Sequence, residues 1–156
     1  MNNEETTINE LVKLLAGGGA HATLKNALAD LPSNLRGAKP HNLPYSIWQL
    51  LEHIRIAQWD MLEFSRDPNH QSPKWPAEYW PVEAEPADER IWKNSIKEIE
   101  KQQEEFIELL KTKDIYENIP HGNGQNILRE ALQMADHNSY HTSEIIIIRR
   151  LLGNWQ

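Results

Sequence analysis

The sequence predicts an all-α protein, a four-helix bundle formed by a single domain over residues 1–156. Apolar residues recur at helical spacing in four separate stretches of the chain. No stretch alternates apolar and polar residues for long enough to indicate a strand, and no repeat of solenoid length is visible. A chain of 156 residues is also long enough to bury one hydrophobic core without disulfides or other cross-links.

The first stretch has helical spacing from Ile8 to Leu15 and continues from Ala22 to Leu31, on either side of the glycines at 17–19. Each glycine costs about 1 kcal/mol relative to alanine in a helix interior. The triplet therefore predicts a break or kink in the first helix, and Pro32 closes the segment.

The second helix is predicted to begin near Pro44 to Ser46, where proline suits a first turn and serine suits a cap, and to run to about Phe64. Its buried stripe is predicted to contain Ile47, Leu50, Leu51, Ile54, Ala57, Met61 and Phe64. His53 borders this stripe, and no neighbouring residue explains an imidazole there.

Residues 65–85 read as a long connection with four prolines and an aromatic cluster of Trp75, Tyr79 and Trp80. A connection of about 20 residues exceeds the usual 2–8 between bundle helices. Such a connection can cross the bundle, so that the second and third helices run parallel. The aromatic cluster is compatible with a lid over a pocket, a subunit contact, or, as is more common, an anchor for the loop.

The third helix is predicted to begin at Pro86 and to extend through Leu110, with a charged outer face in solvent. A linker over residues 114–124 leads to the fourth helix, which ends at Gly153, a suitable carboxy-terminal cap. The stripe of this last helix is predicted to contain Ile127, Ala131, Met134, His137, His141, Ile145, Ile148 and Leu152.

Composition excludes several classes of function. Because the chain has no cysteine, disulfides, iron–sulfur clusters, thiolate zinc sites and a cysteine nucleophile are excluded. A net charge of −7 disfavours nucleic acid as a partner. The acidic amino terminus lacks a signal-peptide pattern, and the aliphatic run from Ile145 to Ile148 is too short to span a membrane. We expect a cytoplasmic protein with a small-molecule substrate and no membrane partner.

His137 and His141 are four residues apart and therefore share one helix face, with β-carbons about 5–6 Å apart. Two such imidazoles can bind one metal ion at about 2.0–2.1 Å each, and His53 is the candidate third ligand. Three imidazoles suit zinc, nickel, copper or iron rather than calcium or magnesium, with zinc or nickel favoured here. Three protein ligands leave a coordination position for water or substrate.

Glu144 follows on the same face, where it can orient an imidazole, join the metal ligands or act as a catalytic base. Asp136 and Glu52 are weaker candidates, and Asn138 stands where zinc proteases have a glutamate. His21 ranks below the other three histidines, and the loop residues His41, His70 and His121 are expected to be exposed. Histidine pairs at this spacing also arise by chance, which leaves a non-catalytic, dimeric stress or ligand-binding protein as the alternative.

Two segments resemble the DinB-like proteins of the DinB/YfiT superfamily. One is Leu-Pro-x-Ser-x-Trp-x-Leu-Leu-Glu-His at 43–53, and the other is Asp-His-Asn-Ser-Tyr-His at 136–141, followed by Arg-Arg-Leu-Leu-Gly at 149–153. The resemblance implies up-down-down-up topology, a divalent metal bound by His53, His137 and His141, and a homodimer. It further implies transferase or isomerase reactions that use bacillithiol, mycothiol or glutathione. Ser143 and Glu144 replace a common Gly-Gln of the family, which changes the charge beside the site.

Overall fold

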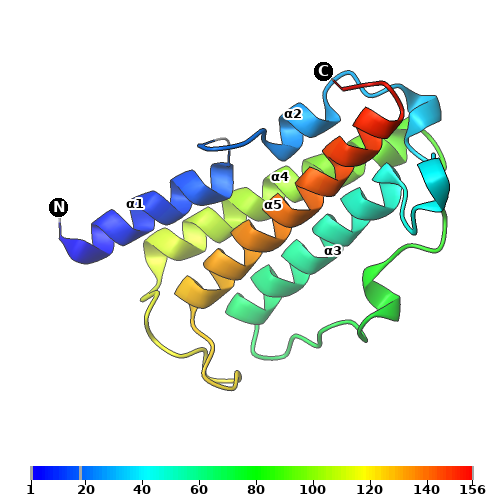
Figure 1. The fold of residues 1–156 in the computed structure, drawn as a ribbon. Helices are drawn as coiled ribbons and strands as arrows, with labels where there is room; N and C mark the ends of the chain where they lie inside the picture. Colours follow the sequence, from blue (N-terminus) through cyan, green and yellow to red (C-terminus); the bar gives the residue numbers. More distant parts are fainter. Residues whose placement is uncertain (1, 18, 156) are drawn as a thin grey trace.

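The computed structural model describes residues 2–17 and 19–155, and within these ranges the ordered secondary structure is helical (Figure 1). An isolated β-bridge joins Asn118 to Asn126, but the described residues form no strand. The α-helices are α1 (Asn3–Ala16), α2 (Leu24–Leu28), α3 (Ile47–Arg66), α4 (Glu89–Thr112) and α5 (Ile127–Leu151), and short 3-10 turns lie at Ser33–Leu35, Pro40–Asn42 and Ala77–Tyr79.

The long helices lie alongside one another. α3 contacts both α4 and α5, α1 also contacts α4 and α5, and α2 contacts α5. In Figure 1, α3 and α4 run in one direction, whereas α1 and α5 run in the opposite direction. The segment between α3 and α4 returns along the outside of α3, which allows these two helices to point the same way (Figure 1). None of the helices in the described ranges has both the length and the hydrophobicity that a membrane span requires.

The predicted break in the first helix is confirmed, although Gly18 itself lies outside the described residues. α1 ends at Ala16, and Gly17 has a φ of 72°, a conformation that glycine adopts without steric cost. The chain then re-enters a helix at Leu24, because Thr23 caps the new amino terminus by accepting a hydrogen bond from the amide of Asn26.

Capping side chains also set the ends of the other helices. The hydroxyl of Ser46 accepts a hydrogen bond from the amide of Gln49, as predicted for the start of α3. The prediction that the third helix begins at Pro86 was wrong. α4 begins at Glu89 because the carboxylate of Asp88 accepts a hydrogen bond of 2.7 Å from the amide of Ile91.

The interior consists of two apolar clusters at opposite ends of the long helices. The first contains residues such as Leu28, Leu50, Leu51, Ile54, Trp92 and Ile145, and the second contains residues such as Leu11, Leu62, Phe106, Leu110, Ala131 and Met134. In the stripe predicted for α3, Met61 and Phe64 are only half-buried, whereas Leu62 is 1% exposed and belongs to the second cluster.

Polar side chains separate the two clusters at mid-height. Along α3, His53 directly precedes Ile54, and Gln58 lies midway between Ile54 and Leu62. Both polar side chains are buried. Along α5, the two histidines lie between Met134 and Ile145, and along α4, Gln102 lies between Ile99 and Phe106. Buried polar groups are costly unless they find partners, so this layer is where a functional site is expected.

Candidate metal centre

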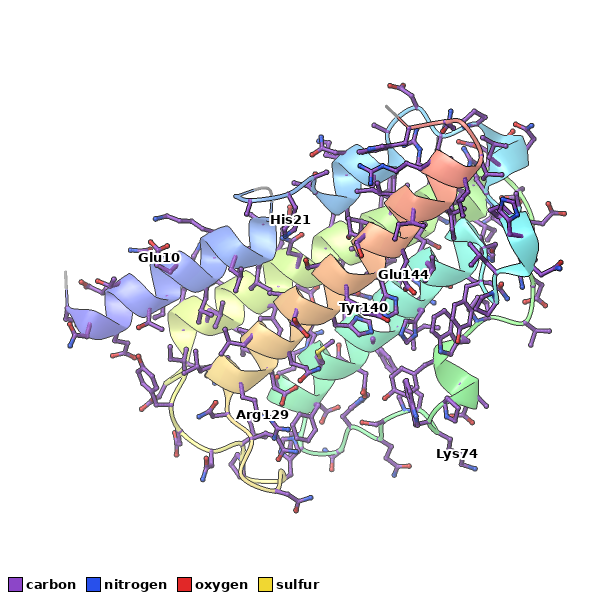
Figure 2. The ribbon with its side chains drawn as sticks, in the orientation of Figure 1. Glu10, His21, Lys74, Arg129, Tyr140 and Glu144 are labelled. Carbon is purple, nitrogen blue, oxygen red and sulfur yellow. The ribbon has the colours of Figure 1, made fainter. Side chains whose placement is uncertain are left out.

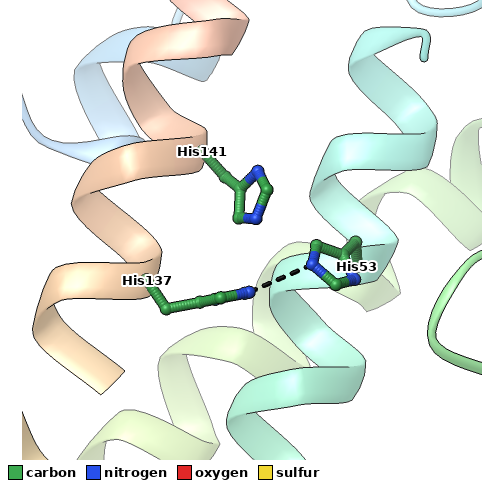
Figure 3. Close-up of side chains that lie close together, drawn as sticks. All are labelled: His53, His137 and His141. Carbon is green, nitrogen blue, oxygen red and sulfur yellow. Dashed lines mark hydrogen bonds between the residues drawn. The ribbon is translucent and has the colours of Figure 1, made fainter. Parts of the chain in front are cut away.

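His53 on α3 faces His137 and His141 on α5 (Figure 3). Each imidazole offers one ring nitrogen, and these three atoms lie within 4.8 Å of one another. The closest pair is Nε2 of His53 and Nε2 of His137, at 3.0 Å. His53 is 2% exposed and His141 is 8% exposed, whereas His137 is half-buried. The structure thus brings together the three histidines that the sequence predicted as metal ligands.

The Nδ1 atom of His53 is fixed by the long connection between α3 and α4. It lies 3.0 Å from the backbone carbonyl oxygen of Tyr79, which can only accept a hydrogen bond. Nδ1 therefore carries the proton, and the lone pair of His53 is on Nε2, directed at the other two histidines. A carbonyl on the outer nitrogen is a common way of orienting a histidine that binds metal.

Asp60 on α3 holds this connection in place. Its carboxylate accepts a hydrogen bond of 2.6 Å from the Tyr79 hydroxyl and lies 2.7 Å from Nε2 of His70. Burial and the hydrogen bond to Asp60 raise the pKa of Tyr79, so its hydroxyl remains a donor. The expectation that His70 is exposed was wrong, since its side chain is 7% exposed.

Aromatic rings cover the histidines on this side. Trp80 stacks on His53 with ring centroids 3.8 Å apart and planes at 7°, and Tyr45 stacks on Trp80 at 3.9 Å. Trp75 is 71% exposed, and its ring centroid lies 6.4 Å from that of His53. Trp80 therefore anchors the connection and covers one face of the His53 ring.

Glu144 lies one turn beyond His141 on the side of α5 that faces α3 (Figure 2). Its Oε2 atom is 2.6 Å from Nδ1 of His141. Because a carboxylate can only accept, Nδ1 of His141 carries the proton and Nε2 is left free for a metal. The Glu144 side chain is 34% exposed, so it is also within reach of solvent. Of the roles considered for Glu144, the contact is that of a residue that orients an imidazole.

His137 lacks such a partner in hydrogen-bond geometry. Its Nδ1 atom and Oδ1 of Asn138 are both buried, and neither has a hydrogen-bond partner among the described residues. The two groups are chemically complementary, because a ring N–H of histidine donates and an amide oxygen accepts. The amide of Asn138 donates to Oε1 of Gln58 at 2.8 Å, and Gln58 in turn donates to the carbonyl of Ile99. This network fixes Asn138 with its oxygen free for His137.

Burial lowers the pKa of His53 and of His137 to about 4 in each case. Both imidazoles are therefore neutral at pH 7, which is the form that binds metal. Two nitrogens that share a tetrahedral zinc ion at about 2.0–2.1 Å are about 3.4 Å apart, close to the 3.0 Å between His53 and His137. The three residues thus fit a divalent transition metal ion.

The remaining candidates lie elsewhere. His21 lies at the α1–α2 break, where its Nε2 atom is 3.2 Å from the hydroxyl of Ser139 (Figure 2). Glu52 forms an ion pair with Arg55, and Asp136 is exposed. Gln58 and Asn138 were not predicted from the sequence as part of the site. The signal for Gln58 was a glutamine four residues from both Ile54 and Leu62, within an apolar stripe.

A family model described as the DinB superfamily matches residues 19–145. The matched range includes the three histidines, Asn138 and Glu144, and it leaves out all of α1 and the end of α5 after Ile145. No match is found among curated proteins or among solved structures.

Proposed function

The chain belongs to the DinB superfamily, and on that basis we propose that it is an enzyme whose His53, His137 and His141 hold one divalent transition metal ion. The observation that carries the proposal is the meeting of three imidazole nitrogens, from two helices, within 4.8 Å of one another. Neutral imidazoles with lone pairs on Nε2 favour zinc or nickel. The outer nitrogens of two of the histidines are already occupied by hydrogen-bond acceptors.

We also propose that α1, α3, α4 and α5 form a four-helix bundle with up-down-down-up topology, in one domain over residues 1–156. The opposite directions of α1 and α3 and the shared direction of α3 and α4 support this arrangement (Figure 1). α2 would then be a short continuation of the first helix after the glycine break.

The proposed reaction transfers a low-molecular-weight thiol, or water, to a small electrophile. A bound metal ion would lower the pKa of a thiol or water that occupies its open position. We assign proton transfer to Glu144, because its carboxylate is partly exposed and already accepts a hydrogen bond from Nδ1 of His141. Trp80 covers one face of the His53 ring, so we assign to residues 67–88 the role of a cover that moves when substrate enters.

A homodimer is part of the proposal. Tyr140, Ile147 and Leu151 are 62%, 50% and 46% exposed and lie on one stripe of α5. Exposed apolar stripes mark protein interfaces, and the chain itself is the simplest partner. Ile147→Glu should convert the dimer to a monomer in sedimentation velocity, whereas Val82→Glu, at an apolar side chain that is 91% exposed and lies outside α5, should not.

Metal content tests the central claim. Freshly purified, untagged protein should contain one zinc or nickel ion per chain by elemental analysis, and alanine at any of the three histidines should remove it. The rival function is a non-catalytic, ligand-binding dimer, which a large cavity away from the histidines favours. That rival would be supported if wild-type protein is purified without metal and its Tm does not change when zinc or nickel is added.

Activity is tested separately with chlorodinitrobenzene and each of bacillithiol, mycothiol and glutathione. In this reaction the S–C bond forms, the C–Cl bond breaks, chloride leaves, and the thiol proton passes to a base. Glu144→Gln should lower kcat by roughly 10²-fold or more while metal stays bound, as expected for loss of a general base. Turnover without any thiol would identify a hydrolase instead, and unchanged kcat in Glu144→Gln would remove Glu144 from the reaction.

A further inference from the structure

A cavity of about 930 Å³ lies between the α1–α2 break, α4 and α5. It exists because the first helix stops at Ala16 and restarts only at Leu24, which leaves the sides of α4 and α5 beneath the break without a covering helix. Its walls are largely apolar, with side chains that include Leu15, Leu24, Leu28, Ile96, Ile99 and Leu132. Cavities that bind small molecules commonly measure roughly 300–1,000 Å³ and have apolar walls with few polar groups.

The cavity lies on the opposite side of α5 from the three histidines, although Asn138, the neighbour of His137, also borders it. On a helix each residue turns by about 100°, so Ala135 and Ser139 of α5 point about 160° away from His137. Ala135 and Ser139 line the cavity, and none of the three histidines of the metal centre does. His21 lies at the cavity instead, on the irregular connection between α1 and α2 (Figure 2).

One end of the cavity carries hydrogen-bond acceptors. Nδ1 of His21 lies 2.9 Å from the carbonyl oxygen of Ala22, so Nδ1 carries the proton and Nε2 accepts. The Ser139 hydroxyl then donates to Nε2 at 3.2 Å, which leaves its oxygen lone pairs for a ligand. Two acidic residues, Glu100 and Asp136, also line the cavity, compared with one basic residue, Lys25.

We propose that this cavity binds an apolar small molecule that carries a hydrogen-bond donor or a positive charge at one end. The apolar walls contact the body of the ligand, and the Ser139 hydroxyl oxygen accepts a hydrogen bond from its donor group. The excess of carboxylates over ammonium groups disfavours an anionic ligand. This binding needs no metal and does not depend on the proposed reaction.

N-phenylnaphthylamine tests the proposal, because it is neutral, apolar, carries one N–H donor and becomes fluorescent in apolar surroundings. Full-length protein should bind it saturably. Ala135→Phe and Ala22→Phe each fill the cavity from a different wall and should raise the Kd at least roughly tenfold, which is about 1.4 kcal/mol. Ala87→Phe, at an exposed position that does not line the cavity, should leave the Kd unchanged. Circular dichroism identifies any variant that fails to fold, and the other filling variant then decides.

Two further arms locate the ligand and its polar end. His53→Ala should bind the probe as wild type does, and Ser139→Ala should bind it several-fold more weakly. Anilinonaphthalene sulfonate, the anionic counterpart, should bind more weakly than the neutral probe. Unchanged affinity in both filling variants, loss of binding in His53→Ala, or preference for the anionic probe would each overturn the proposal.

Discussion

The two flanks of α5 differ in what they offer a ligand. The flank that faces α3 carries His137 and His141, whose neighbours are hydrogen-bonded or stacked and leave little space. The flank that faces the α1–α2 break carries Ala135 and Ser139, which border a cavity of about 930 Å³. Room for a ligand and strong ligand-binding groups therefore lie on opposite sides of one helix.

This difference shows why cavity size alone is a poor guide to chemistry. A large apolar pocket is the usual first choice for an active site, yet no cluster of metal ligands lies in this one among the described residues. The histidine flank is closed, but its donor set is the one that catalysis needs. We therefore assign the reaction to the closed flank and small-molecule binding to the open flank.

The largest expected effect comes from removing a histidine. His137→Ala should lose the bound metal and, with it, the stabilisation that metal gives to the folded state, which is about 4 kcal/mol when free metal is 1,000 times the Kd. Elemental analysis and urea unfolding measure both quantities. His41→Asn is the matched control, because His41 is exposed and asparagine tolerates its φ of 53°. Equal metal content in the two variants would contradict the assignment.

In metal-free protein, acid should lower the free energy of unfolding through the histidines of the flank that faces α3. The pKa values of His53 and His137 are about 4 in the folded state and about 6.5 when unfolded, so the unfolded state binds more protons between these values. The free energy of unfolding should therefore fall as pH drops from about 6.5 to 4, on the order of 2–3 kcal/mol for each histidine. Urea unfolding at pH 7 and pH 4.5 measures this loss.

The double variant His53→Gln/His137→Gln is the control for the acid experiment. Its free energy of unfolding should depend less on pH over the same window, because the groups with lowered pKa values are gone. An identical loss in the double variant and in wild type would show that other groups govern acid unfolding.

Trp80→Ala should open the closed flank. Because Trp80 is half-buried and stacks between Tyr45 and His53, we expect a loss of about 2 kcal/mol, less than for a fully buried aromatic residue. Metal should also transfer faster to a chelator such as a chromogenic pyridylazo dye. Trp75→Ala, at a side chain that is 71% exposed, should change neither quantity much. Equal transfer rates in both variants would show that Trp80 is not the cover.

The smallest effect is expected for Asn138→Ala, which leaves the Gln58 carbonyl without its donor and His137 Nδ1 without its complementary acceptor. We expect destabilisation of about 1 kcal/mol and a metal affinity reduced by roughly 10-fold or more. Competition with a chelator measures the affinity. Ser143→Ala, at an exposed position of α5, is the control. Equal metal affinities in the two variants would show that Asn138 does not support metal binding.

Local rules were enough to predict much of the site. The spacing of His137 and His141 sets their common face once α5 is helical, and the place of His53 within an apolar stripe indicated an inward side chain. The helix break at the glycines and the cap at Ser46 follow from the same kind of local chemistry.

The parts that were missed depend on long-range packing. The Tyr79 carbonyl reaches His53 only because Asp60 holds the connection against α3, and the same contact buries His70. Leu62 is more deeply buried than Met61 because residues of α4 and α5 pack against Leu62 in the second cluster, which periodicity within α3 does not reveal. The cavity follows from where α2 restarts, a matter of loop path as much as of sequence.

The polar layer between the two apolar clusters makes the packing between α3 and α5 weaker at the middle of the helices than at their ends. At either end α3 and α5 pack through aliphatic side chains, whereas at mid-height the facing Nε2 atoms of His53 and His137 both carry lone pairs and repel each other. A metal ion bound by the three histidines would cross-link α3 and α5 at this level. In its absence, amide protons in the central turns of both helices should exchange with deuterium earlier than those at the ends.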